Sequence, residues 1–539
     1  MGHKKLLFRE EARDKVLAGA TLLADAVRVT LGPRSKCVLL ERKWAQPLVC
    51  NDGVTIAKEV SFAEPEMDLG ARMMRQVAER TGEAVGDGTS TATILAHAIF
   101  REGVRNVVAG ASAIDLKRGI DRGLAVATEA LRASSRAVAS RKEKAQVAAI
   151  SAHNDASIGE LVADAVERVG TDGVVSVEEA KTTQTTLDVV EGLQLDRGFA
   201  SPYFVTDPER MECVLENPLI LLHDRRITTM KDLLPLLESV VKAGRSLLII
   251  AEDVDGDALA TLVVNRVRGA IACAAVKAPG FGDRRKALLE DVAIVTGGRV
   301  IAEELGRRLD NVELSDLGTA ARVVIDKDST TIIGGGGDRA AIKARTEQVR
   351  AEIAKATGEY DREKLEERVA KLSGGVAVIR VGAPSEAEMK NRKEAFEDAI
   401  SATRAAIAEG IVPGGGLALL RAAIAVEAEA VRADGDERTG LGLLARALEA
   451  PARQIAENSG YDDGVVVERM RGGSGNFGFD AARGEYVDLI EAGIIDPTKV
   501  VRVGLENAVS VAGVLLLTEA TVTEVPEERA EARGLGETA

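Results

Sequence analysis

Val-Gly-Asp-Gly-Thr-Ser-Thr-Ala-Thr-Ile-Leu-Ala, residues 85–96, is the stretch around which the rest of this chain can be arranged. Asp87 stands between two glycines, three hydroxyl residues follow, and an apolar helical pattern comes next. Glycines let the backbone turn tightly and approach a ligand, and a helix N-terminus offers unpaired N–H groups with a partial positive charge. The stretch therefore predicts a phosphate cradle, in which Asp87 would hold the Mg²⁺ that accompanies a nucleotide.

An ordinary helix cap is the competing interpretation of the same residues. Gly-Asp-Gly turns are frequent before helices that start with Ser or Thr. The stretch is also not the common P-loop, because no Gly-Lys-Ser/Thr follows a spaced glycine. On these residues alone both interpretations stay open.

Composition limits the class of protein. The chain has 539 residues, enough for about two to four domains, with 46% hydrophobic and 29% charged residues. Its net charge of −15 argues against a nucleic acid or an anionic membrane as the main partner, and 3% aromatic residues argue against base-stacking platforms. The four cysteines and four histidines show no metal or redox spacing, which favours a reducing, cytoplasmic location without a zinc site. The sequence shows neither a signal-peptide core nor an apolar run of membrane-spanning length.

The first part of the chain reads as mainly helical. Helical spacing over residues 10–29 ends at Leu31-Gly32-Pro33, a glycine followed by a proline. Two short strand-like runs follow, over 37–40 and 47–50, and lead into Asn51-Asp52-Gly53. That triplet favours a turn, although a turn would also present Asp52 beside a ligand.

The middle of the chain changes pattern. Between residues 192 and 375, apolar strand-like runs alternate with helical ones, which predicts βαβ units and a largely parallel sheet. From residue 416 to Thr523 the pattern is helical again, apart from Gly-rich connections. We therefore expect an α/β multidomain chain in which the two helical ends form one domain and the α/β segment is inserted between them. The short charged tail after Val525 is expected to be disordered.

With these elements in place, the sequence resembles the bacterial GroEL-type, group I chaperonins from about residue 10 to residue 523. The resemblance is carried by many motifs in the same order, which include Thr30-Leu31-Gly32-Pro33, Asp52-Gly53-Val54, Gly86-Asp87-Gly88-Thr89, Asp115-Leu116-Lys117-Arg118-Gly119-Ile120, Ala278-Pro279-Gly280-Phe281-Gly282-Asp283, Glu397-Asp398-Ala399, Gly414-Gly415-Gly416 and Asp496-Pro497-Thr498-Lys499.

The resemblance implies an architecture and an activity. It implies an equatorial nucleotide-binding and ring-forming domain (1–133 and 410–539), an intermediate hinge domain (134–190 and 377–409) and an apical substrate- and co-chaperonin-binding domain (191–376). The implied function is an ATP-dependent chaperonin that encloses unfolded or misfolded polypeptides under a GroES-type co-chaperonin lid. The implied cofactors are ATP, Mg²⁺ and K⁺, and the implied assembly is seven-membered rings, usually two of them stacked.

The resemblance also implies site residues. Asp87 would hold Mg²⁺, and Asp398 and Asp52 would be the catalytic pair that orients the attacking water. This role suits phosphoryl transfer, where positioning matters more than covalent help. The implied nucleotide contacts are Thr30, Leu31, Gly32, Pro33, Asp87, Gly88, Thr89, Ser90, Thr91, Gly415, Asp480, Ala481, Ala482 and Asp496.

A set of apical residues is implied to grip polypeptide and lid. Periodicity alone would place these side chains in a core, but a chaperone needs an accessible apolar surface. The implied residues are Phe199, Tyr203, Phe204, Leu234, Leu237, Leu259, Val263 and Val264.

Several positions depart from the family pattern. Asn51 stands where lysine is common, and His153 and Asp480 stand where asparagine is usual. A charged tail replaces the usual glycine-methionine repeat. These departures motivate an alternative function, an oligomeric protein-binding scaffold with weak or no ATP turnover. A small-molecule kinase is a third candidate, but the sequence shows no acceptor site. Retention of Asp52, Asp87 and Asp398 together favours the ATPase.

Overall fold

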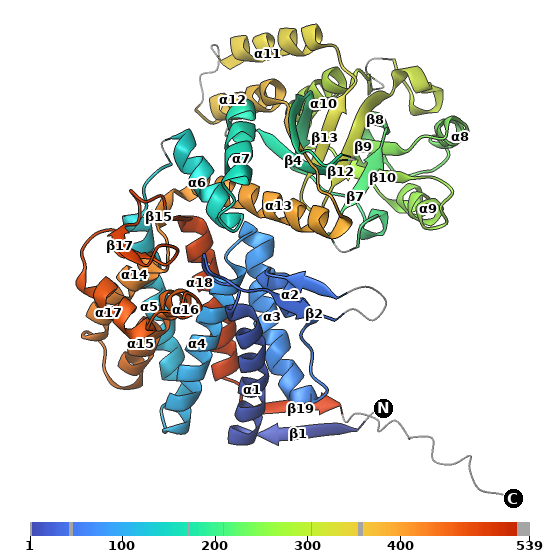
Figure 1. The fold of residues 1–539 in the computed structure, drawn as a ribbon. Helices are drawn as coiled ribbons and strands as arrows, with labels where there is room; N and C mark the ends of the chain where they lie inside the picture. Colours follow the sequence, from blue (N-terminus) through green and yellow to red (C-terminus); the bar gives the residue numbers. More distant parts are fainter. Residues whose placement is uncertain are drawn as a thin grey trace, which may run out of the picture. The chain divides into compact units, whose positions relative to one another are not determined.

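The computed structural model describes residues 3–41, 47–138, 140–170, 173–180, 182–208, 210–302, 304, 306–353 and 359–524. The chain divides into two compact units (Figure 1). The first contains Met1–Ala163 and Glu394–Ala539, and the second contains Asp164–Lys393. The two ends of the chain thus share one unit, as the nested prediction requires. The charged tail after Val525 lies outside the described residues.

The first unit is mainly helical. Its core surrounds α4 (Thr89–Val108), which packs against α1, α3 and α18 and buries Ile94, Leu95, Ile99 and Phe100. Two helices, α7 (Ala156–Val169) and α13 (Glu386–Glu409), cross the division between the units. The other helices of the first unit are α1 (Arg9–Arg28), α2 (Gly53–Glu59), α3 (Pro65–Val85), α5 (Ala113–Ser134), α6 (Arg141–Ser151), α14 (Leu417–Ala430), α15 (Gly435–Ala447), α16 (Ala450–Asn458), α17 (Asp463–Gly472) and α18 (Thr498–Leu516).

Among its described residues, the first unit also has four small antiparallel strand pairs. They are β1 (Lys4–Phe8) with β19 (Ala520–Glu524), β2 (Val38–Leu40) with β3 (Leu48–Cys50), β15 (Ile411–Pro413) with β18 (Ile495–Pro497), and β16 (Phe477–Asp480) with β17 (Glu485–Asp488). The strands after residue 416 correct the prediction of an almost wholly helical C-terminal region. They are three to five residues long, too short to give a periodic signal.

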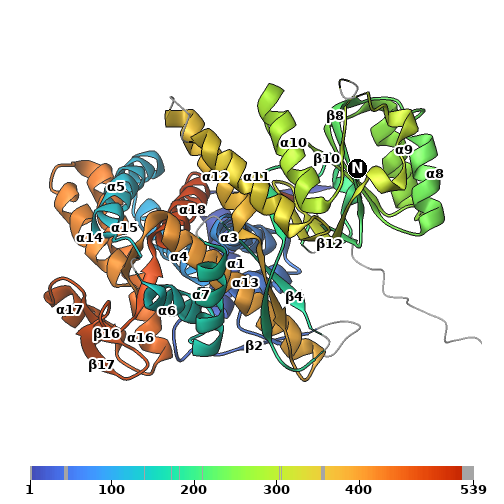
Figure 2. The same cartoon turned by 90° about the horizontal axis from the view of Figure 1, so that it is seen from above.

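The second unit contains the α/β fold. Figure 2 shows α8 (Leu234–Ala243) and α9 (Gly256–Val267) beside one another in this unit. Its remaining helices are α10 (Gly282–Thr296), α11 (Arg339–Ile353) and α12 (Glu359–Gly374), with short 3₁₀ turns at Pro202–Phe204, Leu309–Asn311 and Leu314–Asp316. Its strands are β4 (Val174–Glu179), β5 (Thr186–Val190), β6 (Gly192–Leu195), β7 (Cys213–Glu216), β8 (Leu219–Ile227), β9 (Leu247–Val254), β10 (Cys273–Lys277), β11 (Val300–Ile301), β12 (Gly318–Ile325), β13 (Thr330–Gly335) and β14 (Val376–Val381).

The large sheet of this unit is only half parallel. Strands β10, β9, β8 and β11 pair in parallel, as the βαβ pattern predicts. Strands β12, β13, β6 and β7 pair antiparallel, which corrects the prediction of a largely parallel sheet. Strand β14 pairs parallel with β4 and antiparallel with β5 in a separate sheet. The division into equatorial, intermediate and apical domains stays a prediction.

Candidate functional site

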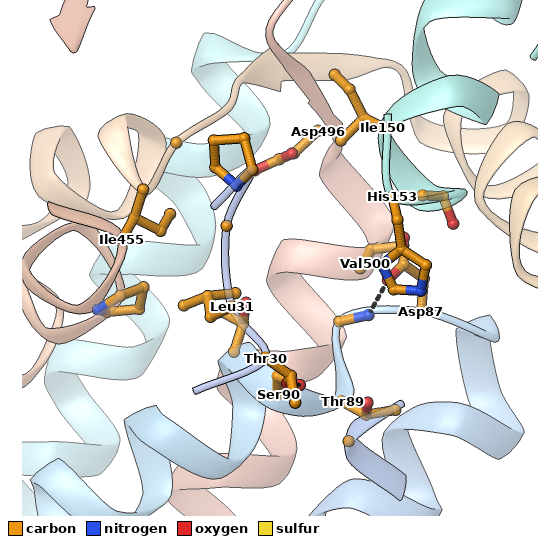
Figure 3. Close-up of a pocket in the computed structure, with 18 of the residues that line it drawn as sticks. Thr30, Leu31, Asp87, Thr89, Ser90, Ile150, His153, Ile455, Asp496 and Val500 are labelled. Atoms are coloured by element: carbon orange, nitrogen blue, oxygen red, sulfur yellow. Dashed lines mark hydrogen bonds between the residues drawn. The ribbon is translucent and has the colours of Figure 1, made fainter. Parts of the chain in front are cut away.

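A cavity of about 780 Å³ lies within the first unit (Figure 3). Every residue that the sequence predicts as a nucleotide contact lines this cavity, and so do both predicted catalytic acids, Asp52 and Asp398. These residues come from segments that are separated by up to several hundred positions in the chain. The fold therefore brings the whole predicted set to one place.

The N-terminus of α4 forms one wall of the cavity. Gly86 and Gly88 have φ angles of 70° and 77°, and Gly88 caps α4 with no side chain bonded to the first turn. The free N–H groups of that turn are the donors that a helix offers to an anion. Asp87 projects from the same turn, where its Oδ1 accepts a 2.5 Å hydrogen bond from the Gly88 N–H.

A second helix N-terminus reaches the same cavity. Gly415 and Gly416 have φ angles of 62° and 77°, and Gly416 caps α14, again without a side-chain hydrogen bond. The pairing of β15 with β18 sets Val412 opposite Asp496, so this glycine loop lies against Asp496. A Cβ added at Gly414 would come within 3.0 Å of the Asp496 Oδ1. A larger residue at Gly414 would therefore displace the Asp496 carboxylate or the Ile494 main chain.

The loop after α1 forms a further wall. The Thr30 hydroxyl donates to the Val27 carbonyl at 2.8 Å and lies 2.9 Å from the Ser90 hydroxyl at the start of α4. Gly32 has a φ of 96°, and a Cβ there would come within 3.3 Å of the Ile455 side chain. The loop is thus fixed between α4 and α16.

Apolar side chains that the sequence reasoning missed line the cavity. Ile455, Phe479 and Ile494 are among them, and Figure 3 shows Ile455 and Asp87 on opposite sides of the view. A cavity with polar groups at one part and apolar groups at another suits an amphipathic ligand. No local signal marked these residues, because their role depends on tertiary packing.

Asp52 has a structural contact that the sequence did not predict. The triplet Asn51-Asp52-Gly53 is not a simple turn: Asp52 is the N-cap of α2, and its carboxylate accepts from Val54 N at 3.4 Å and Thr55 N at 2.8 Å. Aspartate is among the most favoured N-cap residues, which explains why Asp52 starts a helix here instead of a simple turn. The capping bonds fix the orientation of Asp52 at the edge of the cavity.

Carboxyl groups concentrate around the cavity. Burial raises the pKa of Asp398 well above its usual range, and the charges of Asp87 and Asp52 add to the effect. Burial also raises the pKa of Asp87, and it raises the pKa of Asp496 to about 7 with a contribution from Asp87. Mutual repulsion and desolvation both oppose ionisation here. The acids therefore favour a bound cation, which would offset their charge.

The residues that depart from the family pattern also line the cavity. The Asp480 Oδ1 accepts hydrogen bonds from Ala482 N at 2.9 Å and Arg483 N at 3.2 Å, so this carboxylate stabilises the turn between β16 and β17. His153 follows α6 with a φ of 55°, and Figure 3 shows its ring beside Asp87. Asn51 lines the cavity next to Asp52. The three substitutions thus adjoin the predicted nucleotide contacts.

The donor set fits Mg²⁺ brought in with a nucleotide. Among the described residues, no group of three or more His, Cys, Asp or Glu side chains could hold a metal by itself. Mg²⁺ is commonly held by one or two carboxylates together with substrate phosphates and water. Asp87, next to the uncapped turn of α4, meets that requirement.

The predicted apical residues all lie in the second unit, with different exposures. Tyr203 is 70% exposed, Leu234 48% and Val264 44%, and α9 lies close to the Pro202–Phe204 turn. Four others are partly buried against the core of this unit, namely Phe199, Leu237, Leu259 and Val263. Phe204 differs from the expected accessible surface, because it is 0% exposed and belongs to that core; its part in polypeptide binding stays a prediction.

Within the part of the chain that the structure describes, no helix combines the length and apolar character needed to cross a membrane.

Comparison with known proteins agrees with this geometry. Residues 23–526 match the TCP-1/cpn60 chaperonin family. The chain belongs to this family. It is also 68% identical over 531 residues to a protein named Chaperonin GroEL 5 from Bradyrhizobium diazoefficiens, and the match covers 98% of each chain.

This chaperonin is therefore an ATPase that assists protein folding, and it uses ATP and Mg²⁺. Its partners are substrate polypeptides and a GroES-type co-chaperonin, and it forms ring oligomers. Membership of the chaperonin family favours the folding ATPase over a small-molecule kinase and over an oligomeric protein-binding scaffold with weak or no ATP turnover.

The glycine cap of α4 gives a first prediction. A Cβ at Gly88 would lie 2.6 Å from the Val500 side chain, on a residue with a φ of 77°. We expect Gly88→Ala to weaken ATP binding about tenfold, because the left-handed backbone costs ~1–2 kcal/mol for an L side chain. Gly110→Ala is the matched control, since its φ is 101° and a Cβ there meets nothing within 4 Å. Equal ATP dissociation constants for the two variants in titration calorimetry would contradict the account.

Asp496 gives a pH-dependent prediction. Its pKa is about 7 in the folded state and ~3.9 in an unfolded chain, so the folded state binds the extra proton between these values. The contribution of Asp496 to the free energy of unfolding therefore decreases as pH rises through this window. We expect Asp496→Asn to stabilise the nucleotide-free protein by roughly 2 kcal/mol at pH 8 and by clearly less at pH 5.

Urea unfolding at both pH values measures this difference. Asp14→Asn, at an exposed position on α1, serves as the control for removal of a carboxylate. A stabilisation by Asp496→Asn that is equal at pH 5 and pH 8 would show that the carboxyl is not protonated in the folded protein.

Proposed function

We propose that the cavity of the first unit is the ATP site of this chaperonin. The observation that carries the proposal is the convergence of two uncapped helix N-termini, α4 and α14, with Asp52, Asp87, Asp398 and Asp496 on a single cavity. The phosphates would lie against the first turn of α4, and the base would lie toward Ile455 and Phe479. The predicted nucleotide contacts bind ATP in this arrangement.

The acids take distinct roles in hydrolysis. Asp87 holds Mg²⁺, which when bound supplies charge neutralisation at the phosphate oxygens. Asp398, ionised when cations occupy the site, accepts a hydrogen bond from the attacking water and orients it. Asp52, fixed by its capping bonds, supports the same water. K⁺ is the further cation, for which the main-chain carbonyl of Asn51 is a candidate ligand.

The assembly and the cellular setting belong to the same proposal. The chain divides into the equatorial, intermediate and apical domains given above, and it forms seven-membered rings that stack in pairs. Asp398 would belong to the intermediate domain, so hydrolysis would depend on closure of that domain. The protein acts in the cytoplasm.

The exposed apolar residues of the second unit hold the polypeptide. Tyr203, Leu234 and Val264 are large apolar side chains that remain accessible to solvent. Burial of such surface depends on area rather than on sequence, so it suits unfolded chains of many kinds. Release follows if ATP favours a state in which these side chains are less accessible.

Replacing Asp398 tests the hydrolytic role. We expect Asp398→Ala to lower kcat for ATP hydrolysis by about a hundredfold or more, because it removes the group that orients water. ATP affinity should stay within about threefold of the parent, because the phosphate cradle is intact. The control is Glu388→Gln, which removes an exposed i,i+4 ion pair on the same helix. Full turnover in Asp398→Ala under Mg²⁺ and K⁺ would disprove the assignment.

Charged substitutions test the polypeptide-binding surface. We expect Leu234→Glu combined with Val264→Glu to reduce capture of an unfolded test protein at least fivefold, since a carboxylate on each helix opposes apolar burial. These positions are better suited than Leu237, whose partly buried side chain also supports the core. Val465→Glu, at a 64% exposed position in the first unit, is the control. If the double variant and the Val465→Glu control suppress aggregation of the test protein equally, the polypeptide-binding surface lies elsewhere.

A further inference from the structure

The loop that follows α1 is held to the end of that helix by local main-chain hydrogen bonds, among them Thr30 N to Val27 O at 3.1 Å and Lys36 N to Val29 O at 2.8 Å. Leu31 N donates to Arg28 O at 3.3 Å, and Ser35 N donates to Gly32 O at 3.2 Å. These local bonds reach the carbonyls of residues 27–29, but among the main-chain bonds of the described residues none reaches the Leu31 carbonyl, which therefore needs a cap from elsewhere. The loop Thr30–Pro33 lines the cavity.

The cap comes from Asn458, at the end of α16. Its Nδ2 donates two hydrogen bonds of 2.8 Å, one to the Arg28 carbonyl and one to the Leu31 carbonyl. Its Oδ1 accepts a third bond, of 2.9 Å, from the Nε2 of Gln454, which is 7% exposed. A flipped amide would place Oδ1 against two carbonyl oxygens, so only one orientation satisfies all the partners.

Two neighbours of Asn458 strengthen the same attachment. The Arg34 side chain donates to the Ser459 carbonyl at 3.4 Å and to the Ala482 carbonyl at 2.8 Å. It therefore links the loop to the turn that carries Asp480. Ile455, one helical turn before Asn458, packs beside Gly32, as described above. The last turn of α16 thus supports the loop by side-chain bonds and by packing.

We propose that Asn458 is a positioning residue for nucleotide binding. Asn458 does not line the cavity and acts through the main chain of Leu31 and Gly32, which it holds at a fixed distance from the α4 N-terminus. The inference rests on the proposed nucleotide site. It assigns to Asn458, 427 positions from Leu31 in the sequence, the role of fixing the position of the loop Thr30–Pro33 in that site.

Asn458→Asp is the sharpest test, because it keeps the size of the side chain and the acceptor for Gln454. It replaces the double donor with an oxygen that repels both carbonyls. In the full-length assembled protein we expect the dissociation constant and the KM for ATP to rise about tenfold, as for the loss of one or two hydrogen bonds. At saturating ATP, kcat should stay within about twofold of the parent, because Asp398 and Asp52 are untouched.

The controls separate this role from general stability. Asn106→Asp makes the same replacement at the far end of α4, where the amide donates one 2.8 Å bond to a helix carbonyl, and should leave the KM unchanged. Asn458→Ser replaces the aspartate variant if the latter does not assemble, and should raise the KM in the same direction. Parent-like ATP affinity in an assembled Asn458 variant, or a fall in kcat without a change in KM, would overturn the proposal. Failure of the parent to bind ATP would instead disprove the nucleotide site itself.

Discussion

The convergence of two helix N-termini on one cavity is the constraint on which the site depends. Helices α4 and α14 both begin at a left-handed glycine that no side chain caps. A first-turn N–H group that has neither a side-chain cap nor another acceptor costs free energy unless an anion or water bonds to it. The fold tolerates this cost where an anionic ligand binds. Chain segments that begin near residues 30, 51, 86, 414 and 480 are placed around these two termini.

The acidic groups impose a second, opposite constraint. Burial favours the protonated forms of Asp87, Asp398 and Asp496, and the charge of Asp87 adds to the effect at the other two, so the cavity resists holding all of them ionised without cations. An anion at the helix termini and cations between the carboxylates balance each other. This explains why a nucleotide and its metal would bind together rather than separately, and why the empty protein would be less stable at high pH than an Asp496→Asn protein.

Local chemistry explains which parts were predictable from the sequence. The glycines and hydroxyl residues of 86–91 predict the start of α4. The alternation of strand-like and helical runs predicts the βαβ half of the second unit. Asp398 lies on the helix α13, and no motif around it indicates a catalytic role. That proposed role came only from the family resemblance. Ile455 and Phe479 were missed because their contribution arises from packing between distant segments. The antiparallel strands β12 and β13 and the buried ring of Phe204 likewise depend on tertiary contacts that periodicity does not record.

The most direct test of the central claim is an experimental structure of the assembled protein with Mg²⁺ and a non-hydrolysable ATP analogue. The account predicts phosphate oxygens within hydrogen-bond distance of the N–H groups of Thr89–Thr91, with Mg²⁺ bound to Asp87. It also predicts the base beside Ile455 and Phe479. Phosphates bound away from the α4 N-terminus, or a metal without Asp87 among its ligands, would contradict it.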